Sequence, residues 1–283
     1  MLARRAAAAG AAAFAVLAYW TGAVADAAYV PSSDAPKTVV WAVGDGGDGG
    51  ENGLAVAALI AARGLDRFLY LGDVYEHGTA DEFAFNYQPL YGGFDGVTAP
   101  TIGNHEWPTK ATGYDPYWAA VYGEAPPEFY EFSLSGWQLL SLNSEADHGA
   151  DSAQAQWLAA TISSTPGFGD CRIAFLHRPR YSAGVHGDSS LAPLWEALEG
   201  NARIFLSGHD HNMQRFKPRH GLVQLVSGAG GHELFHLDPA TPHLRFAVDE
   251  QYGALRLSLT AGRAGYRFIS ASGKVLDRGR IRC

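Results

Sequence analysis

The chain has 283 residues, of which 47% are hydrophobic and 18% are charged, a balance typical of a globular protein. Its 29 acidic and 21 basic residues give a formal net charge of −8. This charge argues against a nucleic-acid-binding protein, because such proteins carry basic surfaces that neutralise phosphates. It also favours small ligands over polyanions, which an acidic surface repels at long range.

The N-terminal residues 1–28 are typical of an export signal. Arg4 and Arg5 precede an almost wholly apolar run, Ala6 to Trp20, which is followed by small residues suited to cleavage. The paired arginines also resemble a twin-arginine signal. The alternative is an uncleaved membrane anchor, because the apolar run is nearly long enough to span a bilayer. We therefore expect a secreted or periplasmic protein, anchored to a membrane if the segment is retained.

Residues 29–37 contain two prolines and two serines and are expected to form a linker. The sequence after this segment contains the only two cysteines, Cys171 and Cys283. In an exported protein, such a pair favours one disulfide, which would tie down the C-terminus. Two unpaired thiols are the alternative.

The first half of the chain alternates predicted strands and helices. Strands are expected at 38–43, 68–71 and 97–102, and helices at 54–63 and 80–87. Each strand is a short apolar run that ends in a polar, glycine-containing loop. The pattern predicts a layered α/β fold with functional residues at the carboxyl ends of the strands.

The second half begins with a predicted hairpin, 129–134 and 137–142, around the turn Ser135-Gly136. Helices are expected at 151–163 and 191–198, and strands at 172–176, 202–206 and 222–226. From Tyr252 the residues alternate as in antiparallel strands, with turns at 261–262 and 272–273. No internal repeat is visible, so residues 38–283 are predicted to form one domain.

Five short polar blocks follow predicted strands and supply carboxylate, amide and imidazole groups. They are Gly44-Asp45-Gly46-Gly47, Gly72-Asp73-Val74-Tyr75, Gly103-Asn104-His105-Glu106, His177-Arg178-Pro179 and Gly208-His209-Asp210-His211. Oxygen ligands combined with imidazoles suit iron, zinc or manganese. Two such ions need a bridging carboxylate, for which Asp73 is the natural candidate. A metal pair of this kind can clamp both oxygens of an in-line displacement at phosphorus.

Taken singly, these blocks are weak signals. Most Gly-Asp pairs after strands are turns, and a lone loop histidine is usually solvated. The Gly103–Glu106 block is the most specific, because an Asn ligand is followed by a His that can donate a proton. The occurrence of all five blocks, in order and after successive strands, favours the metal-site interpretation.

These blocks make the chain resemble the calcineurin-like metallophosphoesterases, and among them the purple acid phosphatase-like branch. Further matching stretches are Tyr75-Glu76-His77-Gly78-Thr79, Leu142-Asn143-Ser144-Glu145, Gln156-Trp157-Leu158 and His177-Arg178-Pro179-Arg180-Tyr181-Ser182. The resemblance covers roughly Thr38 to Ser227. It implies a four-layer α/β/β/α sandwich, in which two mixed β-sheets are flanked by helices, and a metal-dependent hydrolase of phosphate esters.

Carried over residue by residue, the resemblance assigns two metal ions, iron paired with zinc, manganese or iron. The first would bind Asp45, His211 and one oxygen of Asp73. The second would bind the other oxygen of Asp73 and three more side chains, which are Asn104, His177 and His209. The resemblance implies direct attack by a metal-bound hydroxide, with His105 as the group that protonates the leaving oxygen.

One position departs from the family pattern. The purple branch has a tyrosine ligand three residues after the bridging aspartate, but here Tyr75 is two residues after Asp73 and Glu76 is third. The stretch that follows matches the family and indicates a deletion of one residue. Tyr75 is our predicted ligand, with Glu76 or neither residue as alternatives. The ferric preference depends on this choice.

Of the other histidines, His186 and His232 lie on glycine-flanked loops after ligand-bearing strands and are predicted to contact the substrate. Five more are expected on the surface, namely His77, His148, His220, His236 and His243. The predicted activity is an acid-phosphatase-like phosphomonoesterase acting on small phosphate esters. A phosphodiesterase with the same metals, and a non-catalytic binding protein on a lapsed enzyme scaffold, are the alternatives. The sequence predicts no nucleic-acid partner and leaves the oligomeric state open.

Overall fold

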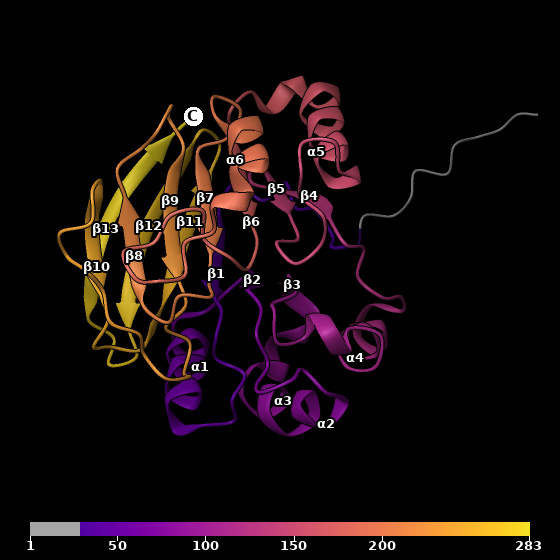
Figure 1. The fold of residues 1–283 in the computed structure, drawn as a ribbon, viewed down its shortest axis with the longest axis vertical. Coiled ribbons are helices and arrows are strands. Elements are labelled where there is room, and N and C mark those ends of the chain that lie inside the picture. The colour runs from indigo at the N-terminus through magenta and orange to yellow at the C-terminus, as the bar shows by residue number, and fades with distance from the viewer. Residues whose placement is uncertain (1–28) are drawn as a thin grey trace, which may run out of the picture.

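The computed structural model describes residues 29–283, which form two β-sheets packed face to face with helices on the outside (Figure 1). The predicted export signal lies outside the described residues. The four-layer arrangement with two mixed sheets confirms the predicted fold class.

The first sheet has six strands in the order β13-β12-β11-β1-β2-β3. The parallel strands are β1 (Thr38–Val43), β2 (Arg67–Tyr70) and β3 (Thr98–Pro100). The antiparallel strands are β11 (Gly253–Thr260), β12 (Arg263–Ser270) and β13 (Val275–Arg282). The C-terminal meander therefore extends a sheet that the N-terminal strands begin.

The second sheet has seven strands in the order β10-β8-β9-β7-β6-β5-β4. Its central strands β5 (Trp137–Ser141), β6 (Arg172–Phe175), β7 (Ile204–Ser207) and β9 (Val223–Ser227) are parallel. Antiparallel strands flank them, which are β4 (Tyr130–Leu134), β8 (Met213–Phe216) and β10 (Leu244–Val248).

Helices cover the outer face of each sheet. Those packed against the first sheet are α1 (Glu51–Arg63), α3 (Gln88–Tyr91) and α4 (Tyr114–Tyr122), while the short α2 (Ala80–Glu82) lies beside α4. Those against the second are α5 (Ala153–Ser164) and α6 (Ala192–Leu198). Ser152 caps α5 by accepting a hydrogen bond from the backbone of Ala155, as its position before the apolar face predicts.

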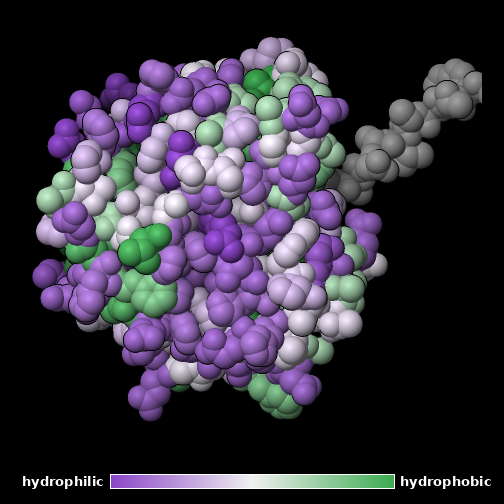
Figure 2. Space-filling view, in the orientation of Figure 1, coloured by the Kyte–Doolittle hydropathy of each residue, from purple (hydrophilic) through white to green (hydrophobic). Residues whose placement is uncertain are grey.

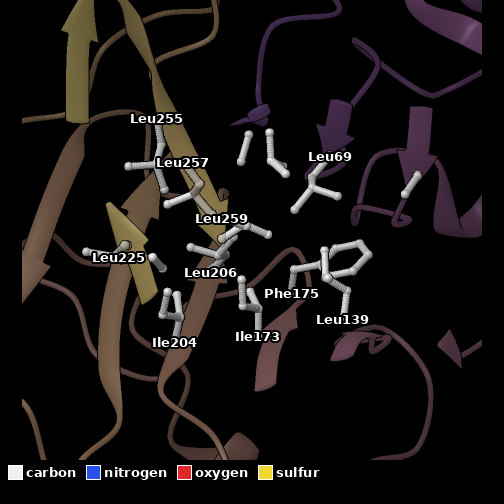
Figure 3. Packing of buried hydrophobic residues seen from close by; sticks show 14 of the residues in the cluster. Leu69, Leu139, Ile173, Phe175, Ile204, Leu206, Leu225, Leu255, Leu257 and Leu259 are labelled. Atoms are coloured by element: carbon white, nitrogen blue, oxygen red, sulfur yellow. The ribbon is translucent and has the colours of Figure 1, made fainter. Parts of the chain in front are cut away.

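Three layers of buried apolar side chains hold together the four layers of sheets and helices. The central one lies between the sheets, where β11 contributes Leu255, Leu257 and Leu259 against strands of the other sheet (Figure 3). A second, rich in tyrosine, lies under α1 and α3, and a third lies under α5 and α6. Alternate side chains of one strand point to opposite faces of the sheet and pack in different apolar layers. Each strand end is therefore packed on both faces.

Two further features fix the ends of the described chain. Cys171 and Cys283 form a disulfide with a Cα–Cα distance of 5.0 Å, so the predicted pair is present. Tyr29 and Val30, in the segment expected as a linker, are buried in the central layer. The backbone of Ser33 bonds to β4 at Ser133. Residues 29–33 therefore pack as part of the domain.

Several local expectations need correction. The single helix predicted at 80–87 is instead α2 followed by a π-helical turn, Phe83–Tyr87, that continues into α3. The sequence reading omitted α4, β8 and β10. The segment of α4 does carry a helical pattern, because its apolar residues Tyr114, Trp118 and Val121 lie on one face. By contrast, β8 and β10 are short strands joined across a register shift.

The visible face of the molecule is mainly hydrophilic, with small separate apolar patches (Figure 2). In residues 29–283, no helix combines the length and apolar character needed to cross a membrane.

Candidate metal centre

The predicted ligands come together because they follow parallel strands at one edge of the two sheets. Asp45 follows β1, Asp73 follows β2, His177 follows β6 and His209 follows β7. Three of these residues have left-handed backbones, with φ of 61° at Asp45, 70° at Asp73 and 65° at His209. Such conformations are uncommon outside glycine and cluster at functional sites.

Glycines allow the loops to approach closely. A Cβ atom at Gly103 would overlap the carboxylate of Asp73, and one at Gly208 would lie 2.6 Å from Asp45 Oδ2. A side chain at either position would therefore displace a predicted ligand. The glycines that precede Asn104 and His209 are required by this packing.

One cluster of donor atoms forms around the phenol of Tyr75. Its Oη lies 2.8 Å from His211 Nε2, 3.2 Å from Asp45 Oδ1 and 3.3 Å from Asp73 Oδ2. The Tyr75 side chain is buried, at 2% exposure. By contrast, the Glu76 side chain is 62% exposed, and its nearest charged neighbour is His232 at 3.7 Å. Of the two alternatives, the tyrosine lies in the cluster.

A second cluster forms around His177. Its Nε2 lies 3.2 Å from Asp73 Oδ2, 3.0 Å from Asn104 Oδ1 and 3.0 Å from His209 Nδ1. Ligand atoms of Asp73, His177 and His209 all lie within 4.8 Å of one another, the spacing of a possible metal-binding triad.

The two clusters share a single atom, Asp73 Oδ2. Our expectation gave each metal a different oxygen of this carboxylate. In the structure, Oδ1 instead accepts the backbone N–H of His105 at 3.1 Å, so Oδ2 alone faces both clusters. The donor set on either side, oxygens mixed with imidazole nitrogens, fits transition-metal ions.

Hydrogen bonds aim the imidazoles at this centre. His177 Nδ1 donates to the carbonyl of Leu71 at 2.8 Å, and His211 Nδ1 donates to that of Glu233 at 2.6 Å. Each bond fixes the ring and directs Nε2 at the cluster, the orientation that metal-binding histidines use. Although burial opposes it, the carboxylate of Asp73 raises the pKa of His177 to about 10, so a metal would have to displace the proton from its Nε2.

Burial also sets the protonation of several donors. It lowers the pKa of His211 to about 4, and together with the charges of His177 and Arg178 it lowers that of His209 to about 2. Both rings are therefore neutral near pH 7 and can offer lone pairs to a metal. Burial and the carboxylates of Asp45 and Asp73 raise the pKa of Tyr75 well above its ordinary value. Its phenol keeps its proton unless a cation replaces it.

His105 lies at the mouth of the centre. Its Nε2 is 3.8 Å from Asp73 Oδ2, and its side chain is 29% exposed. Its Nδ1 donates to the carbonyl of Glu76 at 2.6 Å, so Nε2 faces the open side. A group bound over the two clusters would meet this nitrogen.

His186 and His232 flank the centre on opposite clusters. The ring of His186 lies 5.0 Å from that of His209, and the ring of His232 stacks on Tyr75 at 3.8 Å. His232 Nδ1 faces Asp48 Oδ2 at 3.4 Å. Of the five histidines expected on the surface, His148 is half-buried and bonds to Ser190, and the others are exposed.

Sequence reasoning missed two ionisable side chains beside predicted ligands, Arg178 and Glu106, and the carboxylate that binds the first of them, Glu145. Arg178 Nη1 donates to His209 Nε2 at 3.0 Å, and Glu145 holds the guanidinium with bonds of 2.7 and 3.0 Å. Glu106, fully buried, accepts the backbone N–H of Asp73 at 3.0 Å. Their positions next to His177 and His105 in the sequence were the available signal.

Comparison with known proteins is consistent with this geometry. Residues 32–213 match the sequence pattern of the calcineurin-like phosphoesterases. The chain belongs to the calcineurin-like phosphoesterase family. The chain is 31% identical over 121 residues to tartrate-resistant acid phosphatase type 5 of Oryctolagus cuniculus, an alignment that covers 37% of this chain and 35% of that protein. It is 30% identical over 113 residues to purple acid phosphatase 7 of Arabidopsis thaliana, with 37% and 33% covered.

These alignments span about a third of the length of the curated relatives. Among solved structures, a purple acid phosphatase from yellow lupin (Lupinus luteus) superimposes with a TM-score of 0.71 at 17% identity, covering 89% of this chain and 54% of that chain. At this identity, the likeness supports the fold alone. The predicted family is confirmed by the family match and the acid phosphatase relatives.

Proposed function

We propose that the centre holds two transition-metal ions and hydrolyses small phosphate monoesters. The observation that carries this proposal is the single carboxylate oxygen, Asp73 Oδ2, shared by two clusters of donor atoms. In the proposal, Tyr75, Asp45 and His211 complete the first site. Asn104, His177 and His209 complete the second.

When bound, such a pair of ions supplies Lewis acidity, both for polarising a phosphate ester and for activating water. The protein's part is to hold these donors rigidly. The left-handed loops and the imidazole hydrogen bonds described above do so before any ligand arrives.

Four side chains are assigned to the substrate. His105, with Nε2 toward the open side, would give its proton to the leaving oxygen. Arg178, fixed by Glu145, is a guanidinium at the rim of the second cluster and suits an anionic oxygen of the ester. His186 and His232 border the same opening and would contact phosphate.

We further propose that residues 29–283 act as the catalytic domain, since residues 29–33 pack with it, and that residues 1–28 direct export to a secreted or periplasmic location. The N-terminal charge and apolar pattern support export, and the disulfide is consistent with an oxidising compartment.

The activity test compares hydrolysis of a phosphate monoester and a phosphate diester reporter by the purified protein, before and after chelation and metal replacement. The proposal expects faster monoester hydrolysis that chelation abolishes and added metal restores. Faster diester hydrolysis would assign the phosphodiesterase alternative. Full metal loading with no hydrolysis of either reporter would assign a binding protein.

A further inference from the structure

A strongly basic trough lies on the outer face of the first sheet, over β11, β12 and β13. It has a volume of about 1070 Å³ and shares no lining residue with the metal centre. Its cationic side chains are Lys37, Arg256, Arg263, Arg267, Arg278 and Arg280. In Figure 1 this end of the sheet lies on the opposite side of the molecule from α4 and α5.

The strand register places the arginines directly beside one another. Arg256 on β11 is opposite Arg267 on β12, which is in turn opposite Arg278 on β13. Arg263 is likewise opposite Arg282. Like charges directly opposite across a sheet are destabilising. Folding alone does not account for this row, because uncharged residues would fit an exposed face better.

The row is also uncompensated. No acidic residue lines the trough, and within residues 29–283 none of its six cations forms an ion pair. Elsewhere some arginines are paired, as Arg215 is with Asp277 at 2.7 Å. Burial, and then repulsion from Arg267 and Arg63, lowers the pKa of Arg256, and the charge of Asp66 offsets this only in part. An anion bound here would relieve this repulsion.

The residues that line the trough argue against nucleic acids and lipid surfaces as its ligands. Between the arginines its lining is small, formed by Ser258, Thr260, Gly265 and Gly279. Its one aromatic ring, Tyr266, is buried, so no ring is available to stack on a base. No exposed apolar residue lines it, so nothing would insert into a lipid surface.

Adjacent strands lie about 4.8 Å apart, so the row of guanidinium groups crosses the sheet at short regular intervals. Guanidinium groups bind phosphate oxygens through paired N–H donors. A row of guanidinium groups can contact several phosphates of one chain at once. A single small anion can contact only one or two of these groups.

We propose that this trough binds a chain of linked phosphates, of which inorganic polyphosphate is the simplest. The site is independent of the activity proposed for the metal centre. The formal net charge of −8 does not reveal this site, because no acidic residue lines the trough.

The test measures binding of fluorescently labelled inorganic polyphosphate to the full-length protein across a range of salt concentrations. Wild-type protein should bind with an affinity that falls steeply with salt. The double variant Arg267→Gln/Arg278→Gln should bind roughly tenfold or more weakly, with a salt slope lower by about two charges. The matched control Lys217→Gln/Arg245→Gln removes two exposed cations outside the trough and should bind like wild type.

Two further measurements separate this site from the metal centre and from misfolding. Asp73→Ala should retain polyphosphate binding, and the trough variant should retain wild-type hydrolysis of a small ester and an equal or higher Tm. Equal affinity of the trough variant and wild type would overturn the proposal. Tighter binding of single-stranded DNA, or of anionic phosphatidylglycerol vesicles, than of polyphosphate would overturn the choice of ligand.

Discussion

The pair Tyr75 and Glu76 illustrates how much depends on single side chains at the first cluster. Sequence spacing alone placed Glu76 at the family's tyrosine position. The fold instead buries Tyr75 among Asp45, Asp73 and His211 and leaves Glu76 largely in solvent. The loop after β2 therefore places the phenol of Tyr75, and not the carboxylate of Glu76, beside the other donors.

Substitution of Tyr75 tests its role as a ligand. Tyr75→Phe should weaken metal binding at the first site and abolish visible absorption of the iron-loaded protein, because a ferric phenolate absorbs by charge transfer. Glu76→Gln, one residue away and exposed, is the matched control and should change neither property. Titration of metal content with visible spectroscopy measures both. The reverse pattern, or a colourless iron-loaded wild type, would rule out Tyr75.

Substitution of His105 tests its role as a proton donor. His105→Ala should keep both metals but slow hydrolysis of an alkyl phosphate by roughly 10²–10⁴, the usual contribution of a general acid. The loss should be much smaller for a nitrophenyl phosphate, whose leaving group needs no proton. His77→Ala removes an exposed histidine nearby and is the control. Equal losses on both substrates would indicate phosphate positioning instead.

At the residue scale, sequence reasoning found the donors but not their supports. Asp45, Asp73, His177 and His209 follow strands within recognisable blocks, so their meeting could be predicted. The Arg178–Glu145 pair could not, because only folding brings Glu145 beside the residue that follows His177.

At the scale of elements, the strands that position the site were the most predictable part. β1, β2, β6 and β7 are short apolar runs buried on both faces, which is a strong local pattern. By contrast, β10 is a partly exposed edge strand that tertiary contacts determine more than local sequence does. The helix α4 was missed although Tyr114, Trp118 and Val121 lie at helical spacing on its buried face.

The carboxyl group of Asp95, beside the aromatic cluster under α4, should make the stability of the protein depend on pH. Burial raises the pKa of Asp95 from 3.8 to about 6, and Tyr117 donates to it at 2.7 Å. Its neutral form is favoured in the folded state, so its stabilising contribution is present below pH 4 and is lost as the pH rises through 6. The Tm of Asp95→Asn minus that of wild type should therefore increase by a few degrees between pH 4 and pH 7. A difference independent of pH would show that the carboxyl ionises normally.

At the scale of the molecule, the disulfide joins the two sheets. Cys171 precedes β6 in one sheet and Cys283 follows β13 in the other, 112 residues apart. A cross-link over so long a loop restricts the unfolded chain and is worth about 2–4 kcal/mol.

Removal of the disulfide should therefore lower the Tm by about 5–15 °C. Thermal unfolding of Cys171→Ser/Cys283→Ser measures the change. Reduction of the wild type should produce a similar shift and expose two thiols to a labelling reagent, and the double variant should be insensitive to reductant. Two reactive thiols in the unreduced protein would contradict the pairing.

The central claim is that Asp73 bridges two metal ions, and elemental analysis of the purified protein tests it most directly. Wild-type protein should hold close to two transition-metal ions per chain. Asn104→Ala should retain the first ion and lose the second, and Asp73→Ala should lose both while remaining folded by circular dichroism. A wild type that binds at most one ion after metal reconstitution, or an Asp73→Ala variant that keeps two, would contradict the account.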